Sequence, residues 1–306
     1  MNKSFTLIEI LVVIVVIGVL SAFIFVGMSS ITSSANIAKV QVFTNSLDNS
    51  LLLARVSQWK LDQINGTSPA TTPDSWNLNT GTLMDGADNT CVFGSSPECP
   101  QPVTSGCVSG SCLFFDGSND YVDCGNDLSL SVSNVITISA WIKVSGFSTT
   151  RRIVTKFDNN DGTYDGYSMM VYSGGTLLQI YKLGTGNDAG IAHNVPLNVF
   201  SCITYVYDGT NKKLYMDGVY IGQAAAGATS IGTTATTLRI GGTFSGAQPF
   251  YGIIDDVRIY NQVLSTSQIQ QNYYVGISKL FKNNEITLNE FNQRIVELKN
   301  NIVNNE

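Results

Sequence analysis

Six cysteines are the side chains of this 306-residue chain that most readily do chemistry. No two have CxxC spacing and His193 is the single histidine, so a zinc site is not expected. An even number of cysteines, four of them in a Pro-, Gly- and Ser-rich stretch, is typical of disulfides formed in an oxidising compartment. Spacing leaves the pairing open; we expect local bridges among the first four, and the last two are a candidate long-range pair: Cys91, Cys99, Cys107, Cys112, Cys124 and Cys202.

Carboxylates could catalyse glycoside hydrolysis, which needs two of them roughly 5–10 Å apart. Asp255 and Asp256 are adjacent, so on a strand they would point to opposite faces and could not act as a pair. The acidic run 158–165 lacks the spacing of an EF-hand loop and predicts a solvated hairpin loop. We therefore expect a protein that is not an enzyme, with a carbohydrate-active enzyme as a remote alternative.

The net charge of the chain limits which classes of partner we expect. The net charge is −6, the pI is about 4.8, and only 13% of the residues are charged. A nucleic-acid partner would need a clustered Lys/Arg face. The sequence therefore predicts no nucleic-acid binding.

The N-terminal residues form a candidate membrane span. Residues 10–28 are 19 residues without a charge, and as a helix they would cover about 28 Å, close to the hydrocarbon thickness of a bilayer. Lys3 precedes the run, so we expect the N-terminus in the cytoplasm and a span over about residues 8–28. Glu9 stands at its edge, where a carboxylate is costly and usually has a partner.

The string KSFTLIE, from Lys3 to Glu9, followed by a long apolar helix, resembles the N-terminus of type IV prepilins and pseudopilins. In that family a membrane peptidase cuts before the Phe and methylates it, and the Glu pairs with a neighbouring subunit's terminal amine during assembly. The resemblance implies cleavage between Ser4 and Phe5 and an assembly role for Glu9, although Ser4 stands where the family nearly always has Gly. A secretory signal peptide, whose apolar core would be shorter, and a plain membrane anchor are the alternatives.

The apolar run continues as an amphipathic helix. Residues 29–55 contain no Pro and no Gly, and apolar residues recur at helical spacing: Ile31, Ala35, Ala38, Val42 and Leu47. We expect one long helix over residues 5–54, after a leader of residues 1–4.

Beyond residue 55 the period changes from helix to strand. Apolar and polar residues alternate in successive runs, and Asp-Gly and Gly-Gly hairpin signals separate them. This pattern predicts a mainly β fold, an antiparallel β-sandwich or jelly roll. The clearest runs are 135–144, 167–172, 177–181, 200–207, 213–216, 237–240 and 252–260.

Four strings, in this order, resemble LamG-like (concanavalin A-like) jelly rolls: FFDGSNDYV, ISAWIKV, YVYDGTNKKLYMDGV and GIIDDVRIYNQVL. The resemblance covers about residues 55–274. Hydrolases of this fold usually carry acidic residues alternating along one strand, and this chain has no such string. Because the sandwich serves lectins, adhesins, glycosidases and spacers, the resemblance implies the fold more strongly than the function.

The same resemblance implies a calcium site between the opening loop and the last strand. It would use Asp74 and Asn77 from the loop, with Asp255 or Asp256 from the strand, since Ca²⁺ prefers hard oxygen ligands. The alternative is that Asp74 caps a turn and one strand aspartate hydrogen-bonds a neighbouring loop.

Aromatic side chains are candidates for binding a glycan or another surface ligand, with burial in the core as the alternative for each. The candidates are Tyr164, Tyr167, Tyr172, Tyr181, Phe244, Phe250 and Tyr251.

Two capping boxes mark the C-terminal tail. Ser265 to Gln268 predicts a short helix to about residue 274, and Thr287 to Glu290 starts another after a helix over 276–282. We expect a sandwich domain over 55–275 and a helical hairpin over 276–306.

Together these features predict a pilin-like or pseudopilin-like surface subunit that displays a LamG-like head for adhesion or for carbohydrate or protein recognition. Its expected partners are membrane lipid, prepilin peptidase, pilus or secretion-type assembly machinery, and copies of itself in an oligomer or filament. It would cross the cytoplasmic membrane once, with the head extracytoplasmic, and reach the cell surface or a pilus if assembled. The alternative is a membrane-anchored interaction protein that does not polymerise.

Overall fold

A computed structural model describes residues 51–303, except 52, 67, 87–88, 93–98, 148–149, 159–163, 183, 187–188 and 244–247. The chain divides into two compact units, Met1–Ser46 and Leu47–Glu306, and every described residue belongs to the second, called the head below. Ser4, Phe5, Glu9 and the predicted membrane span lie outside the described residues. Within the described part, neither helix is long and apolar enough to cross a membrane.

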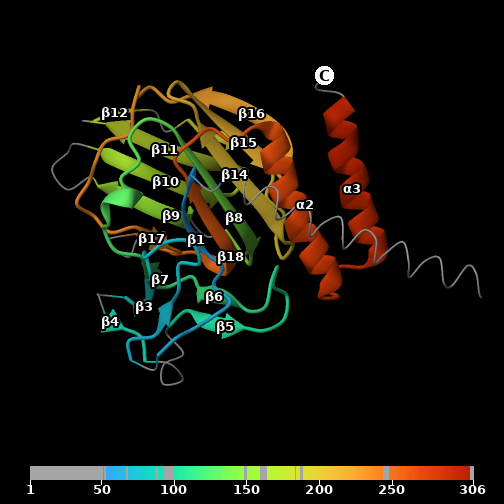
Figure 1. The fold of residues 1–306 in the computed structure, drawn as a ribbon, viewed down its shortest axis with the longest axis horizontal. Coiled ribbons are helices and arrows are strands. Elements are labelled where there is room, and N and C mark those ends of the chain that lie inside the picture. Colours follow the sequence, from blue (N-terminus) through green and yellow to red (C-terminus); the bar gives the residue numbers. More distant parts are fainter. Residues whose placement is uncertain are drawn as a thin grey trace, which may run out of the picture. The chain divides into compact units, whose positions relative to one another are not determined.

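The head is built on two antiparallel sheets (Figure 1). The first sheet runs in the order β16 (Val219–Ala225), β15 (Asn211–Met216), β14 (Ser201–Tyr207), β8 (Ile136–Val144), β18 (Tyr251–Tyr260), β6 (Cys112–Asp116) and β5 (Gln101–Val103), and β1 (Arg55–Trp59) also pairs with β18. The second runs β12 (Thr185–Gly186), β11 (Gly175–Lys182), β10 (Asp165–Tyr172), β9 (Arg151–Asp158), β17 (Arg239–Ile240), β7 (Asp120–Asp123), β3 (Gly81–Asp85) and β2 (Thr71–Thr72). The short strands β13 (Ile191–Ala192) and β4 (Asn89–Thr90) pair with β11 and β3.

The alternating sequence pattern explains why the sheets stack. Along β8, Ile138, Ala140 and Ile142 are fully buried in one core with Met169 of β10 and Leu178 of β11. Burying one face of each strand is the main favourable term in such a fold. The predicted mainly β antiparallel sandwich is confirmed.

Two helices follow the last strand: α2 (Thr266–Lys282) and α3 (Leu288–Val303). The predicted capping box is present, since the Ser265 hydroxyl accepts the N–H of Gln268 and the Gln268 side chain accepts the N–H of Ser265. The sequence pattern divided α2 near residue 275, which is wrong. The helix runs through Gly276 because this glycine lies against the Trp141 ring, where an added Cβ would be 2.2 Å from Cζ2.

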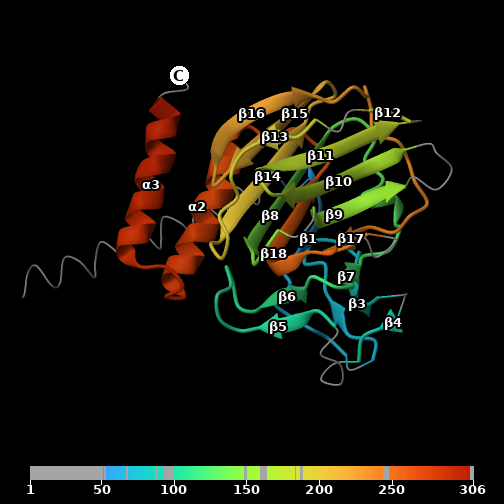
Figure 2. The ribbon, with the colours of Figure 1, turned by 180° about the vertical axis from the view of Figure 1, so that it is seen from behind.

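The helices cover the outer face of the first sheet. Trp141 of β8 and Cys202 of β14 are buried in one cluster with Tyr273 and Ile277 of α2 and Leu298 of α3. The Trp141 and Tyr273 rings stack with centroids 5.5 Å apart. In Figures 1 and 2, β8 and β18 lie between α2 and the strands β9–β11 of the second sheet. The two sheets therefore present different outer faces.

Candidate functional site

The cysteines pair locally. Disulfides join Cys91 to Cys99 and Cys107 to Cys112, which confirms the expected local bridges. The candidate Cys124–Cys202 pair is wrong, because both thiols are free and buried. Cys124 lies in the core between the sheets, whereas Cys202 lies on the helix-covered face of the first sheet, so the sheet separates the two sulfurs.

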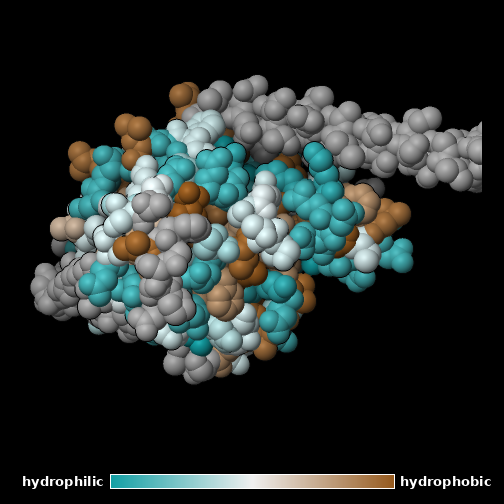
Figure 3. Space-filling view, turned by 90° about the horizontal axis from the view of Figure 1, so that it is seen from below, coloured by the Kyte–Doolittle hydropathy of each residue, from teal (hydrophilic) through white to brown (hydrophobic). Residues whose placement is uncertain are grey.

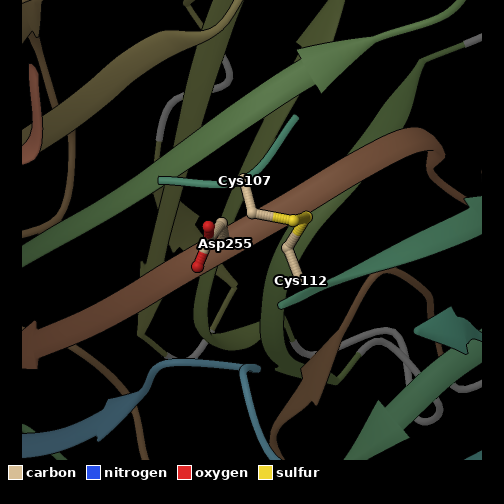
Figure 4. A group of neighbouring side chains, drawn as sticks. All are labelled: Cys107, Cys112 and Asp255. Carbon is tan, nitrogen blue, oxygen red and sulfur yellow. A yellow bond between two sulfur atoms is a disulfide. The ribbon is translucent and has the colours of Figure 1, made fainter. Parts of the chain in front are cut away.

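Asp255 lies beside the second disulfide (Figure 4). Its Oδ2 accepts the N–H of Val108, which is in the loop closed by Cys107 and Cys112, at 2.7 Å, and the side chain is fully buried. Burial, with the charge of Asp256, raises the pKa of Asp255 well above its ordinary value. Ligand atoms of Asp255 and the two cysteines lie within 4.8 Å of one another, but the sulfurs are bonded to each other. The cluster therefore anchors the disulfide loop to β18.

Asp256 is engaged in a buried ion pair. Its Oδ2 lies 2.6 Å from an Arg258 nitrogen, and Gln58 donates to its Oδ1 at 2.7 Å. Arg258 also donates to Asn272 of α2 at 2.7 Å, so the pair lies under that helix. Burial opposes ionisation here, yet the Arg258 guanidinium holds the pKa of Asp256 below its usual range.

The prediction that Asp255 and Asp256 face opposite sides of the sheet is wrong. The pairing of β18 with β8 shifts register between Asp255 and Arg258, and Asp256 has a φ of 44°. Such a bulge interrupts the two-residue alternation of a strand. Both carboxylates consequently lie on the helix-covered face.

The predicted calcium ligands make hydrogen bonds within the protein. Asp74 Oδ1 accepts the N–H groups of Gln58 and Trp76, each at 2.9 Å, which is the turn-capping arrangement. The Asn77 amide donates to the Val56 carbonyl at 3.4 Å. Arg258 engages Asp256, whereas Asp74 Oδ2 and Asp255 Oδ1 are buried without a hydrogen-bond partner among the described residues, so the calcium site with Asp74, Asn77 and Asp255 stays a prediction.

The outer face of the second sheet carries a polar row. In register across β11, β10, β9, β17 and β7, five polar side chains follow one another: Gln179, Ser168, Thr155, Arg239 and Asp123. The neighbours Met169 and Val154 point into the core, so the row lies on the opposite face of the sheet. Its side chains are nevertheless buried there, with Ser168 at 0%, Thr155 and Arg239 at 5% and Gln179 at 9% exposure. Thr155 and Ser168 share a hydrogen bond of 3.0 Å, and Arg239 Nε lies 3.6 Å from Asp123 Oδ2.

Arg152 of β9 joins this row. One guanidinium nitrogen donates to Ser168 at 2.8 Å and to Gln179 at 2.5 Å. Arg239 lies over the Tyr121 ring, 4.2 Å from its centroid. The row thus holds donors and acceptors in fixed positions on one sheet face.

An aromatic trio of Phe157, Tyr164 and Tyr181 stands beside the polar row. The ring centroids are 5.4–5.7 Å apart, and Tyr164 is 41% exposed. Phe157 and Tyr181 follow Thr155 and Gln179 by two residues on their strands, which places them on the same outward face.

The other aromatic candidates differ from the trio in how far they are buried. Tyr167 and Phe250 are buried in the core, and Phe244 lies outside the described residues. Tyr172 and Tyr251 are half-buried, and Arg151 lies over the Tyr251 ring. The sequence did not single out Phe157 or the polar row, because it predicted no strand over β9 (Arg151–Asp158); the Thr-x-Phe spacing there was the available signal.

Comparison with known proteins places this head in a family. Residues 116–270, half of the chain, match the model of the concanavalin A-like lectin/glucanases superfamily. The chain belongs to this superfamily. Residues 1–25 match the prokaryotic N-terminal methylation motif, so a type IV pilin-like N-terminal segment precedes the concanavalin A-like head.

Solved structures similar to the concanavalin A-like head include domain 4 of AbnA, a GH43 extracellular arabinanase from Geobacillus stearothermophilus, in complex with arabinotriose. It has a TM-score of 0.51 and 19% identity and covers 71% of this chain and 97% of that one. The binding domain of Paraclostridial Mosquitocidal Protein 1 has a TM-score of 0.53 and 15% identity, covering 73% and 52%. A Trypanosoma rangeli sialidase mutant has a TM-score of 0.53 and 13% identity, covering 80% and 39%. These likenesses show the fold.

A curated relative, the adhesion G-protein coupled receptor V1 of Danio rerio, is 28% identical over 171 residues. The aligned part is 52% of this chain and 3% of the relative, so the chain spans a small part of that protein's length.

Proposed function

We propose that this protein is a pilin-like surface subunit whose concanavalin A-like head binds a glycan or protein ligand at the exposed Tyr164 and the aromatic trio of the second sheet. One observation carries the proposal: α2 and α3 cover the outer face of the first sheet, whereas at the second the exposed Tyr164 belongs to an aromatic trio supported by a buried, hydrogen-bonded polar row. The similarity to a binding domain and to an arabinotriose-bound domain supports it.

The chemistry of this face suits a carbohydrate. Aromatic rings offer apolar faces for the C–H groups of a sugar ring, and convergent polar groups fix its orientation. Gln179 and Thr155 lie two residues before Tyr181 and Phe157 on the same strands, and as largely buried groups they hold the strands that carry these two rings.

The N-terminal segment supports membrane insertion and assembly. Within the matched methylation motif, Ser4 and Phe5 flank the proposed cleavage site and Glu9 is the proposed assembly carboxylate. We place the head on the extracytoplasmic side, with pilus or secretion-type machinery as partner. The second candidate, a membrane-anchored protein that does not polymerise, rests on the apolar run alone.

We further propose recognition without catalysis. Asp255 and Asp256 are buried under α2 and engaged by the disulfide loop and Arg258, which supports this view. Calcium binding stays a prediction, tested by thermal unfolding in calcium and in chelator.

The binding proposal is tested with residues 47–306, a compact unit that contains its own core and both disulfides. On a glycan array we expect binding that Tyr164→Ala weakens at least about tenfold, the order expected for loss of an aromatic contact. The matched control is Tyr220→Ala, on β16 of the first sheet, which is 36% exposed. Equal loss in both variants, or no binding to any glycan or surface protein, would contradict the proposal.

A further inference from the structure

An open pocket of about 360 Å³ lies at one end of the sandwich, beside the start of β8. It is lined by residues 128–129 and 131–135, which precede β8, and by Asn261, which follows β18. Its size is near the lower end of the range for small-molecule sites, roughly 300–1,000 Å³. None of the aromatic trio lines it, so the pocket is a separate cavity.

The lining of the pocket is polar and uncharged. Four polar residues surround it beside the side chain of Leu128: Ser131, Ser133, Asn134 and Asn261. Within the described residues, the side chains of these four make no hydrogen bond to the protein. Hydroxyl and amide groups both donate and accept, as the hydroxyls of a sugar do, so the pocket matches a sugar in its hydrogen-bonding groups.

The loop that forms the pocket is held in place before any ligand arrives. It begins with the short helix η1 (Leu128–Leu130), which the Asp127 side chain caps through the N–H of Ser129 at 2.8 Å. The Tyr167 hydroxyl donates to the last carbonyl of η1 at 2.9 Å. A pre-ordered site loses little conformational entropy on binding, so its contacts contribute more fully to affinity.

One dipeptide joins the pocket to the aromatic trio. The N–H of Ile231 donates to the Ser133 carbonyl and the N–H of Gly232 donates to the Tyr181 carbonyl, each at 2.7 Å. Since these amides are consecutive, the two carbonyl oxygens are at most about 9 Å apart. Gly232 also lies against Asp165, which follows the exposed tyrosine of the trio: a Cβ added to Gly232 would be 1.8 Å from Oδ1. The pocket and the trio therefore lie at the same end of the head, within reach of one extended ligand.

The uncharged lining indicates a neutral ligand. An acidic group that leaves water needs an opposite charge, which the pocket does not offer, and the chain has a net charge of −6. On the face seen in Figure 3, hydrophobic side chains stand in small separate groups among hydrophilic ones, so this face has no extended apolar surface for a protein partner. A neutral oligosaccharide suits these features better than an acidic glycan or a protein.

We propose that this pocket is a second subsite of the recognition surface and binds one sugar of a neutral oligosaccharide, another sugar of which stacks on Tyr164. The inference rests on the proposed function, because the aromatic trio holds the other part of the ligand, and it adds the class of the ligand. Asn134 and Asn261 bind sugar hydroxyls, and Leu128 contacts the C–H groups of the same sugar. A ligand that reaches both sites binds more tightly than one that reaches a single site.

The test titrates residues 47–306 with neutral oligosaccharides of glucose, galactose, mannose or N-acetylglucosamine, from monosaccharides to hexasaccharides, and with the same series ending in sialic acid. We expect affinity for the neutral series to rise at least about tenfold with length. The double variant Asn134→Ala/Asn261→Ala should lose this rise and still bind the shortest ligands as the parent does. Both side chains are exposed, and thermal unfolding checks that the variant folds. The matched control is Asn289→Ala, at an exposed position of α3, which should bind as the parent does.

The outcomes separate the inference from the proposed function. A head that binds through Tyr164 with the same length dependence in the parent and the double variant overturns the pocket subsite alone. Preference for the series ending in sialic acid overturns the neutral class of ligand. A head that binds a surface protein through Tyr164 and no glycan overturns the inference and leaves the proposed function. A head that binds neither overturns both.

Discussion

At the scale of single residues, the buried pair Asp256–Arg258 explains why the last strand carries two adjacent aspartates. The left-handed backbone at Asp256 turns its carboxylate to the helix side, where Arg258 and Gln58 bind it. A buried charge that is paired and hydrogen-bonded is tolerated, whereas its unpaired partner is costly. The pair therefore stabilises both the bulge in β18 and the packing of α2 against the first sheet.

Asp256→Asn tests this role, since asparagine suits a left-handed backbone and only the charge is lost. We expect the variant to lose about 3–5 kcal/mol of unfolding free energy in urea titrations, because Arg258 is left buried without a counter-ion. The control is Asp208→Asn, which breaks the partly exposed pair with Lys213 and should cost about 1 kcal/mol or less. Similar losses in both variants would contradict the assignment.

Asp120 makes stability depend on pH. Burial raises its pKa to about 7, and the charges of Asp116 and Asp85 add to the shift. Between the ordinary carboxyl pKa of about 4 and this value, the folded chain binds more protons than the unfolded chain, so stability falls as pH rises from about 4 to about 7.

Asp120→Asn keeps an oxygen for the N–H of Asp116, which donates to Asp120 at 2.9 Å. Urea unfolding from pH 4 to pH 8 should show a smaller slope in this variant and a gain on the order of 1–3 kcal/mol at pH 8. Part of the slope of stability against pH should remain in the variant, because the pKa of Asp255 is also raised. Asp127→Asn, at an exposed position, is the control, and the same slope in both variants and the parent would contradict the prediction.

At the scale of elements, α2 depends on close approach to the first sheet. Gly276 lets the helix lie against the Trp141 ring, which stacks on Tyr273 of the same helix. Ala is the better helix former by about 1 kcal/mol, but its Cβ has no room here. Packing against Trp141, and not helix propensity, therefore explains the glycine at position 276.

Gly276→Ala should therefore destabilise the head by about 1–3 kcal/mol and weaken the near-ultraviolet signal of the Trp141–Tyr273 stack, since the helix must shift outward. Gly222→Ala is the control, because a Cβ there meets Ile191 at an ordinary 3.6 Å. Thermal unfolding measures both. A Gly276→Ala variant as stable as Gly222→Ala would show that α2 packs elsewhere.

The sequence predicted the elements whose pattern is local. Alternation predicted β8 and β18, and the Ser265 capping box predicted the start of α2, because each depends on residues close in the chain. The bulge at Asp256 and the uninterrupted α2 depend on contacts with distant residues, so the local pattern gave the wrong side for Asp256 and a false break at Gly276. Long-range pairing also decides the polar row, which only the strand register brings together.

At the scale of the whole molecule, a methylation-motif segment precedes a concanavalin A-like head. The head has one sheet covered by its own helices and one that carries a buried polar row beside an aromatic trio with an exposed tyrosine. The N-terminal segment supplies the proposed membrane insertion and assembly. The proposed function therefore assigns display to the head and assembly to the N-terminal segment.

Glu9→Ala tests the assembly function. We expect membrane insertion to persist, because removing a carboxylate makes the segment more apolar, and filament incorporation to fall at least about tenfold, because the partner of the neighbouring terminal amine is lost. Membrane fractionation and filament yield measure the two effects. Normal filaments from this variant would make Glu9 an incidental charge at the edge of the apolar run.

The mature N-terminus of the protein isolated from membranes tests the central claim most directly. N-terminal sequencing with mass analysis should find methylated Phe5, the product of cleavage after Ser4 within the matched motif. An intact Met1 in the membrane fraction would contradict pilin-like processing and favour a plain membrane anchor.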